Sequence, residues 1–119
     1  MYRKDFGKKG EQFAKEELIK KGLKFIASNF TFKKLEIDLI FEDKKSKEIV
    51  FFEVKTRTST DYGQPEDAID AKKQLNIRTA ASVFLKLNRE FKNHKIRFDI
   101  FSVLKNGGEY IHKHIVNGF

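Results

Sequence analysis

Two apolar runs with β-strand composition, residues 48–57 and 96–105, lie on either side of a long segment with helical periodicity. That segment runs from Glu66, just after Pro65, to about Asn88, and apolar side chains recur along it at helical spacing: Ile77, Ala80, Ala81, Phe84 and Leu87. A strand, a helix of this length and a second strand make the connection that parallel neighbours in a sheet require. The sequence therefore predicts a parallel β-α-β unit at the centre of the fold.

The rest of the chain completes a mixed sheet. The remaining predicted elements are a helix over residues 8–21, which ends at Gly22, and strands over 23–30, 36–42 and 110–116, the last at an edge. The predicted order is αβββαβ with one further strand, an α/β fold whose mixed sheet is flanked by helices. A chain of 119 residues suits one domain, residues 1–119.

The charge balance bounds the class of partner. Lysine and arginine total 25 against 17 acids, which gives a net charge of +8 and favours DNA, RNA or an acidic membrane surface as partner. The absence of cysteine excludes disulfides and thiolate metal sites and favours a reducing compartment. No apolar run approaches the length of a membrane span, so we expect a cytoplasmic protein that does not cross a membrane.

Charged residues interrupt the most apolar part of the predicted sheet. Because side chains alternate along a strand, Glu53 and Lys55 project to the same face. A symmetric hairpin with the preceding strand makes Asp38 face Glu53 and Glu36 face Lys55. Two carboxylates about 5 Å apart repel by about 3 kcal/mol at an effective dielectric of about 20. A divalent cation that prefers oxygen ligands, Mg²⁺ or Mn²⁺, would remove this repulsion, and Lys55 could offset part of it. From spacing alone, a metal site and a structural ion pair both stay open.

Five segments together resemble the YraN family of small bacterial proteins: GEQFAKEEL, EIDLIFED, VFFEVKTR, YGQPEDAIDAKKQ and IRFDIFSV. The resemblance extends from about Gly7 to Val103. That family is similar to the PD-(D/E)XK nucleases, and in particular to archaeal Holliday-junction resolvases. The resemblance implies a restriction-endonuclease-like αβββαβ core and Mg²⁺-dependent hydrolysis of phosphodiesters. Ile37 stands where the superfamily motif has a proline before its first acid.

The resemblance also implies roles for individual residues. The two motif acids fall on Asp38 and Glu53, the motif lysine falls on Lys55, and the helix acid that joins the metal site falls on Glu11. With the backbone carbonyl of Val54, these acids would hold Mg²⁺ or Mn²⁺. Lys55 would orient or deprotonate the attacking water and offset charge on the phosphate.

Other polar residues are candidates for binding or for structure. Lys73 and Gln74, near the start of the second predicted helix, either contact the scissile phosphate or are simply solvated. Sequence-independent contacts with backbone phosphates are expected of three more residues: Lys33, Lys34 and Arg57. Asp99 interrupts an apolar strand, and we expect it to be a buried partner of Arg97 or Arg78 rather than a catalytic group.

Three functions are compatible with these features. The first is a metal-dependent nuclease that acts on branched, flapped or single-stranded DNA in repair or recombination. The second is a non-catalytic nucleic-acid-binding module, which would bind in a salt-sensitive manner that chelators do not affect. The third is a protein-interaction subunit, which would bind no nucleic acid at all. The resemblance to resolvases, which make two symmetric cuts, also implies a homodimer.

Overall fold

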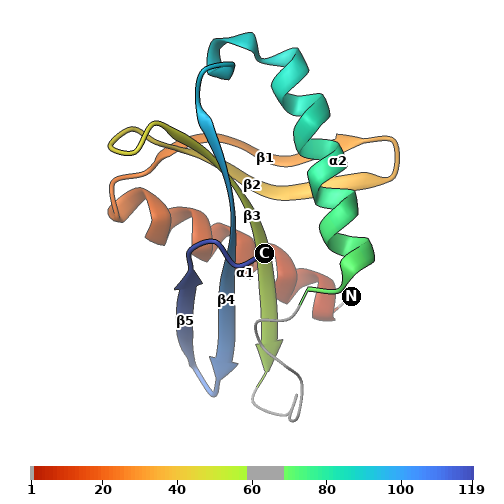
Figure 1. Cartoon of the computed structure of the whole chain (residues 1–119). Helices are drawn as coiled ribbons and strands as arrows, with labels where there is room; N and C mark the ends of the chain where they lie inside the picture. Colours follow the sequence, from red (N-terminus) through yellow and green to blue (C-terminus); the bar gives the residue numbers. More distant parts are fainter. Residues whose placement is uncertain (1, 59–68) are drawn as a thin grey trace.

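A computed structural model of the protein describes residues 2–58 and 69–119, which form a five-stranded sheet with one long helix on each face (Figure 1). The elements follow in chain order as α1 (Tyr2–Lys20), β1 (Lys24–Phe32), β2 (Leu35–Asp43), β3 (Glu48–Thr58), α2 (Ala71–Leu87), a short 3₁₀ helix (Arg89–Phe91), β4 (Lys95–Asn106) and β5 (Glu109–Ile115). The strands lie in the order β1-β2-β3-β4-β5. Only β3 and β4 are parallel, and the other neighbours are antiparallel. The predicted αβββαβ order, the mixed sheet and the additional edge strand are confirmed.

Both faces of the sheet are buried, which explains the unbroken apolar run from Ile49 to Phe52 in β3. On the α2 face, Phe51 and Phe98 stack at a centroid distance of 5.6 Å, and Phe84 of α2 packs against Phe51 at 5.9 Å. On the α1 face, Ala14 and Leu18 pack into a second cluster with strand residues: Leu39, Phe41, Val50, Phe52, Phe101 and Val103. The sheet is therefore the middle layer of three.

The start of α2 differs from the prediction. The helix begins at Ala71, and the Asp70 carboxylate caps it by accepting a hydrogen bond of 2.8 Å from the backbone N–H of Lys73. The predicted continuous helix from Glu66 is wrong, because Ile69 and Asp70 are not helical and the extended Asp70 caps the helix that follows it. Pro65 and Glu66 themselves lie outside the described residues.

The end of α1 is where the sequence predicts it. Gly22 has φ of +94°, a left-handed conformation that glycine adopts without steric cost. The N–H of Leu23 donates to the carbonyl of Leu18 at 3.2 Å, the closing bond of a glycine-terminated helix. This turn reverses the chain into β1.

Asp99 of β4 is fully buried and belongs to a structural network. It accepts hydrogen bonds from Arg97 at 2.9 Å and from the backbone N–H of Asn117 at 3.0 Å, and it is 2.8 Å from the His114 ring. Burial acts to raise the pKa of Asp99, but its bonds to His114 and Arg97 hold it below its ordinary value. Of the two partners predicted for Asp99, Arg97 is therefore confirmed, and Arg78 instead lies over the ring of Phe98.

Within the described residues, neither helix has the length and apolar composition of a membrane span.

Two glycines of α1 make a matched test of how closely this helix packs on the sheet. A methyl group at Gly10 would overlap the side chain of Thr56 in β3, whereas a methyl group at Gly7 meets open space. We expect Gly10→Ala to lower the free energy of unfolding by about 1–3 kcal/mol through overpacking. Gly7→Ala should raise it by about 0.5–1 kcal/mol, because alanine loses less backbone entropy in a helix. Urea unfolding measures both, and shifts of the same sign would contradict this packing.

Candidate active site

The candidate site lies where β2 and β3 separate. The five paired positions run from Asp43 opposite Glu48 to Leu39 opposite Phe52, in the predicted register. Beyond Leu39 the strands diverge, and Figure 1 shows β3 turning away from β2 to run beside β4. At the divergence the Asp38 carboxylate accepts a hydrogen bond of 2.7 Å from the backbone N–H of Val54. The Asp38 side chain thus takes the place of a backbone acceptor between the two strands. We call the point where β2 and β3 separate, next to Asp38, the fork.

The predicted pairing of Glu36 with Lys55 is not part of the ladder. Glu36 lies opposite Thr31 of β1, and Lys55 lies beside Ser102 of β4. The hairpin model extended a regular ladder past Asp38, where the carboxylate interrupts it. The prediction is therefore wrong for this pair, although the register that produced it is right for the five pairs before the fork.

Asp38 is a partly buried acid in an unfavourable environment for charge. Burial and the charge of neighbouring Glu53 raise the pKa of Asp38 from 3.8 to about 8. The charge of Glu11 acts in the same direction, whereas the hydrogen bond from Val54 acts against it. Near neutral pH the carboxyl group therefore holds a proton unless a positive charge replaces that proton.

Glu53 completes the pair. Its side chain is 14% exposed, and its Oε2 atom lies 3.6 Å from the Nζ atom of Lys73. Among the described residues its other oxygen, Oε1, is buried without a hydrogen-bond partner. Burial raises the pKa of Glu53 above its ordinary value, and the charges of Lys73 and Lys55 oppose this shift. A buried acceptor without a donor is costly, so the Glu53 carboxylate needs either the proton that Asp38 holds or a cation in its place.

A second pair of acids lies beside the first and was not identified from the sequence. The side-chain amide of Asn29 donates to Glu11 at 2.9 Å and to Glu36 at 3.2 Å. Asn29 has φ of 51°, a left-handed conformation that asparagine tolerates better than most residues. This conformation occurs in β1 at the position facing Asp38, between the paired positions Ser28–Leu39 and Phe30–Ile37. The sequence feature that could have indicated this second pair of acids is an asparagine within a predicted strand.

The structure brings Lys73 and Lys55 to the carboxylate pair from different elements. Lys73 comes from the first turn of α2, and its contact with Glu53 shows that it is not merely solvated. Lys55 lies two residues after Glu53 on β3, near enough to lower the pKa of Glu53. Gln74 follows Lys73, but its amide nitrogen donates to the carbonyl of Ile69 at 2.8 Å. Its predicted contact with phosphate stays a prediction.

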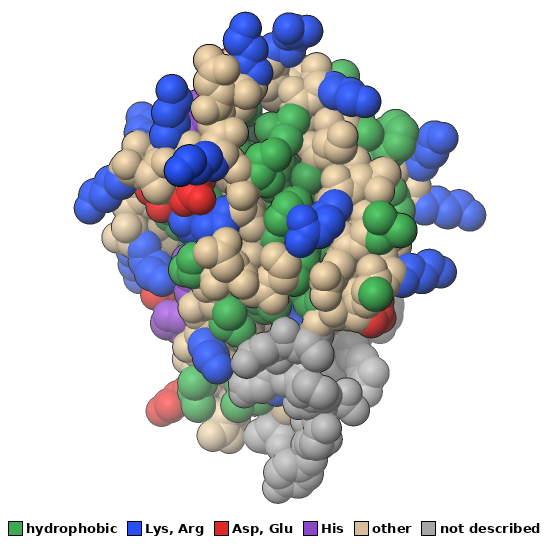
Figure 2. Space-filling view, in the orientation of Figure 1, with side chains coloured by type: hydrophobic (Ala, Val, Ile, Leu, Met, Phe, Trp, Pro, Cys, Tyr) green, Lys and Arg blue, Asp and Glu red, His purple; other side chains and the backbone are tan. Residues whose placement is uncertain are grey.

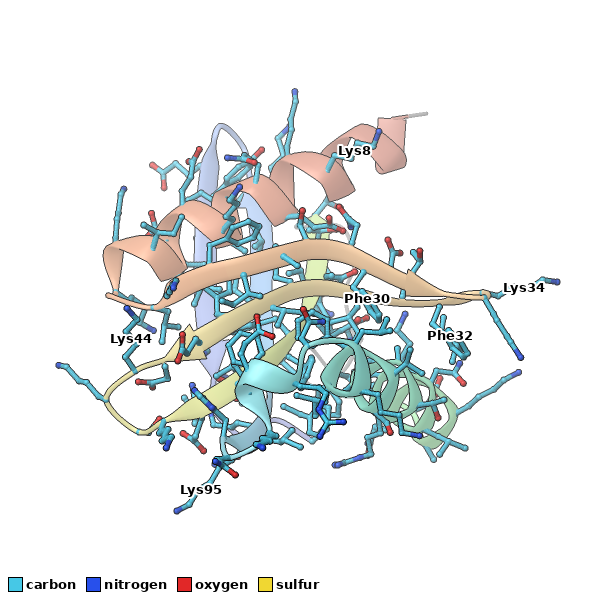
Figure 3. All side chains as sticks on the ribbon, turned by 90° about the horizontal axis from the view of Figure 1, so that it is seen from above. Lys8, Phe30, Phe32, Lys34, Lys44 and Lys95 are labelled. Carbon is cyan, nitrogen blue, oxygen red and sulfur yellow. The ribbon has the colours of Figure 1, made fainter. Side chains whose placement is uncertain are left out.

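The three residues expected to contact DNA backbone phosphates lie apart from the carboxylates. Lys33 and Lys34 form the exposed turn between β1 and β2, and Figure 3 shows Lys34 at the tip of that hairpin, pointing away from the sheet. Arg57 lies near the end of β3, beside Leu104 of β4. Their positions are compatible with contacts along a duplex or a single strand that extends beyond the site.

The donor set fits a divalent cation that prefers oxygen ligands. Mg²⁺ or Mn²⁺ would compensate two carboxylates with raised pKa values. Among the side chains that the structure describes, in residues 7–58 and 69–119, no three Asp, Glu or His side chains are grouped closely enough to hold a metal ion. The side-chain donors present together are therefore Asp38 and Glu53. Glu11 lies next to them, and its carboxylate accepts a hydrogen bond from the side chain of Asn29. Ligation by Glu11 and by the carbonyl of Val54 stays a prediction.

Comparison with known proteins identifies relatives over the whole chain. A family model described as "Uncharacterised protein family UPF0102" matches residues 10–103. A UPF0102 protein of Syntrophomonas wolfei is 40% identical over 116 residues, which cover 98% of each chain. One of Caldanaerobacter subterraneus is 42% identical over 98% of this chain and 96% of the relative. One of Dictyoglomus thermophilum is 35% identical over the full length of both.

Proposed function

This chain belongs to the uncharacterised protein family UPF0102, and from that premise we propose that it is a metal-dependent nuclease that hydrolyses phosphodiester bonds in DNA. The observation that carries the proposal is the buried pair Asp38 and Glu53 in the fork between β2 and β3. A purely structural pair of charges would be of opposite sign, as Arg97 and Asp99 are elsewhere in the same sheet. Two like charges placed together in a partly buried site indicate a function that needs them both.

Asp38 and Glu53, with the carbonyl of Val54 and with Glu11, would hold Mg²⁺ or Mn²⁺. Such an ion, when bound, supplies Lewis-acid polarisation of a phosphate oxygen and activation of water. The protein prepares this site by burying the two carboxylates, which makes the exchange of a proton for a divalent cation favourable. The hydrogen bond from Val54 fixes the orientation of Asp38.

The two lysines next to the pair supply the positive charge for the rest of the reaction. Lys55 follows Glu53 on the same side of β3 and is placed to orient the attacking water and to offset charge that develops on the phosphate. Lys73 reaches the same carboxylate from α2 and is placed to exchange Glu53 for a substrate phosphate. The two lysines therefore reach the carboxylate pair from two different elements, β3 and α2.

The net charge of +8 supports a polyanionic substrate. We propose DNA, with branched, flapped or single-stranded structures as the favoured substrates, in repair or recombination. RNA is a further candidate substrate. The cytoplasm is the proposed compartment, because no cysteine in the chain requires an oxidising one. The homodimer implied by the resolvase resemblance stays a prediction.

The direct experiment is a cleavage assay with end-labelled single strands, duplexes, flaps and four-way junctions in Mg²⁺ or Mn²⁺. We expect at least one substrate to be cut, and chelation with EDTA should stop the cutting. If the wild type binds these DNAs but cuts none with either metal, the protein is a non-catalytic nucleic-acid-binding module. If it binds none at low salt, it is an interaction subunit, and the nuclease proposal is wrong.

A further inference from the structure

A pocket of about 620 Å³ opens on the α2 face of the molecule, away from the carboxylate pair. It lies between the second half of α2, the start of β4 and residues 117–119. Figure 2 shows hydrophobic side chains exposed at the centre of this face, with lysine and arginine side chains around them. The pocket is therefore both apolar and basic.

The apolar part of the pocket is formed by Leu85, Ile96, Phe98 and Phe119. Ile96, the second residue of β4, is 48% exposed, whereas the strand residues that directly follow it are buried. An exposed aliphatic side chain beside two aromatic rings offers little to a phosphate but suits the flat face of a nucleobase. This composition favours a ligand with both rings and negative charge.

Arg78 joins the apolar and the basic parts. Its guanidinium lies over the ring of Phe98, 4.4 Å from the centroid, and Phe51 stacks on that ring as its neighbour in the sheet. Arg78 is nevertheless an exposed residue, so the stack ends in a planar cation that faces the pocket. Arginine planes held in this way stack on unpaired bases and bind phosphates.

The polar side chains along α2 are repeated at four-residue intervals. The stripe consists of Gln74, Arg78, Ser82 and Lys86. Each interval advances about 6 Å along the helix, so one polar group is presented per turn. The stripe begins one residue after Lys73, whose ammonium group contacts Glu53. It therefore links the candidate active site to the pocket.

The positive charge of the pocket is only partly neutralised. Arg97 lines the pocket but is paired with Asp99 and Glu48. Among the described residues Arg78 and Lys86 have no ion-pair partner, and no carboxylate side chain lines the pocket. These two cations are available for an anionic ligand.

The pocket and the polar stripe of α2 together form one groove. We propose that this groove binds a single-stranded segment of DNA that continues from the active site along α2. The inference rests on the proposed nuclease function for the direction in which the strand enters, from Lys73 toward Lys86. A single strand uses both parts of the groove, because its bases stack on Arg78 and the apolar floor while its phosphates contact the cations. A duplex keeps its bases paired inside and would leave the apolar floor without a contact. The preferred substrate is therefore DNA with a single-stranded tail.

The first test measures binding without cleavage, in EDTA at about pH 6, below the raised pKa of Asp38. We compare Arg78→Gln/Lys86→Gln with Lys20→Gln/Lys24→Gln, which removes the same charge at the end of α1 and the start of β1, outside the residues that line the pocket. Fluorescence anisotropy of a labelled oligothymidylate of about 15 nucleotides should show at least a tenfold loss of affinity for the groove variant, roughly what two phosphate contacts supply. Its salt dependence should become shallower by about 1.4 in the log-log slope.

Two comparisons decide the outcome of that test. The control variant should bind the single strand within about threefold of the wild type, because distributed surface charge contributes only weakly. The groove variant should also bind a duplex of equal length within about threefold of the wild type, because it keeps the contacts that a duplex makes elsewhere. If the groove variant loses single-strand and duplex affinity equally, or loses neither, the groove is not a single-strand site.

The absence of cysteine allows a second test that depends on no loss of binding. In Ser82→Cys a fluorophore can be attached at one unique position beside the pocket, and Lys24→Cys carries the same probe at the start of β1, outside the residues that line the pocket. Titration with the single strand should change the emission of the probe at residue 82 saturably and leave the probe at residue 24 unchanged. Equal responses at both positions would contradict the proposal, as would no response at residue 82.

These binding tests are separate from the cleavage assay. If the wild type cuts DNA but the groove tests fail, the nuclease proposal is supported and the single strand does not bind in the groove. If the groove tests succeed but no metal supports cutting, the groove stands and the nuclease proposal is wrong.

Discussion

Lys55→Met is expected to lower the rate constant of DNA cleavage by about 10²- to 10⁴-fold, the range for loss of a general acid-base or charge-stabilising group. Methionine keeps most of the length of the side chain but removes the ammonium group two residues from Glu53. Because the charge acts on the transition state, the loss should appear in kcat and much less in KM. Single-turnover cleavage of the best substrate, with protein in excess, measures it.

Lys44→Met is the matched control for this prediction. Lys44 follows β2 in the turn toward β3, and Figure 3 shows it at the opposite end of the sheet from Lys34. Its cleavage rate should stay within about twofold of the wild type, since an exposed lysine in a turn has no contact with the reaction. Equal rates for Lys55→Met and the wild type would remove Lys55 from the mechanism.

Asp38→Asn is expected to make the metal-free protein more stable above about pH 7, although it removes a residue of the site. The pKa of Asp38 is raised from 3.8 to about 8 in the folded state, so folding takes up a proton between these values. The contribution of this group to stability is therefore fully present below about pH 4 and is lost as the pH rises to about 8. Since one pKa unit corresponds to about 1.36 kcal/mol, the loss amounts to at most about 6 kcal/mol.

The asparagine variant should not show this loss. Its amide oxygen can still accept the hydrogen bond from Val54, but it carries no charge at any pH. Urea unfolding in EDTA should give similar free energies for both proteins near pH 5, and a higher value for Asp38→Asn near pH 8. Addition of Mn²⁺ should stabilise the wild type near pH 8 and not the variant, because binding to the folded state alone raises stability. If the free energy of unfolding of the wild type does not fall between about pH 5 and pH 8, the raised pKa of Asp38 is contradicted.

Asp99 serves as an internal contrast in the same titration. Its pKa is lowered in the folded state, so its contribution is present above its unfolded value of 3.8 and is lost only as the pH falls below that. The two acids therefore act in different pH windows. Loss of stability toward acid is assigned to Asp99, and loss toward neutral pH is assigned to Asp38.

The architecture could be predicted from the sequence because local patterns determine it strongly. The apolar runs of β3 and β4, with the helical stripe of α2 between them, admit only a parallel pair. The hairpin register follows because a slip of one residue would turn Phe41 and Val50 out of the α1-side core. The start of α2 was placed too early because Pro65 and Asp70 are both acceptable start signals, and sequence periodicity does not rank them.

The site was predicted only where it depends on strand alternation. Asp38 and Glu53 come together because they are the chain neighbours of Leu39 and Phe52, the last pair of the predicted and observed register. The fork was not predictable, because it requires a side chain to replace a backbone acceptor, and no periodic pattern encodes that substitution. The link from Asn29 to Glu11 and Glu36 also escaped prediction, because it joins α1, β1 and β2 through one residue in a left-handed conformation.

The most direct test of the central claim is the number of protons released when the wild type binds Mn²⁺. Titration calorimetry in two buffers that differ in ionisation enthalpy gives this number at each pH. Because the cation replaces the proton on the Asp38–Glu53 pair, we expect about one proton to be released near pH 7 and a release that falls toward zero near pH 9. Absence of Mn²⁺ binding, or binding near pH 7 with no proton release, would contradict the account.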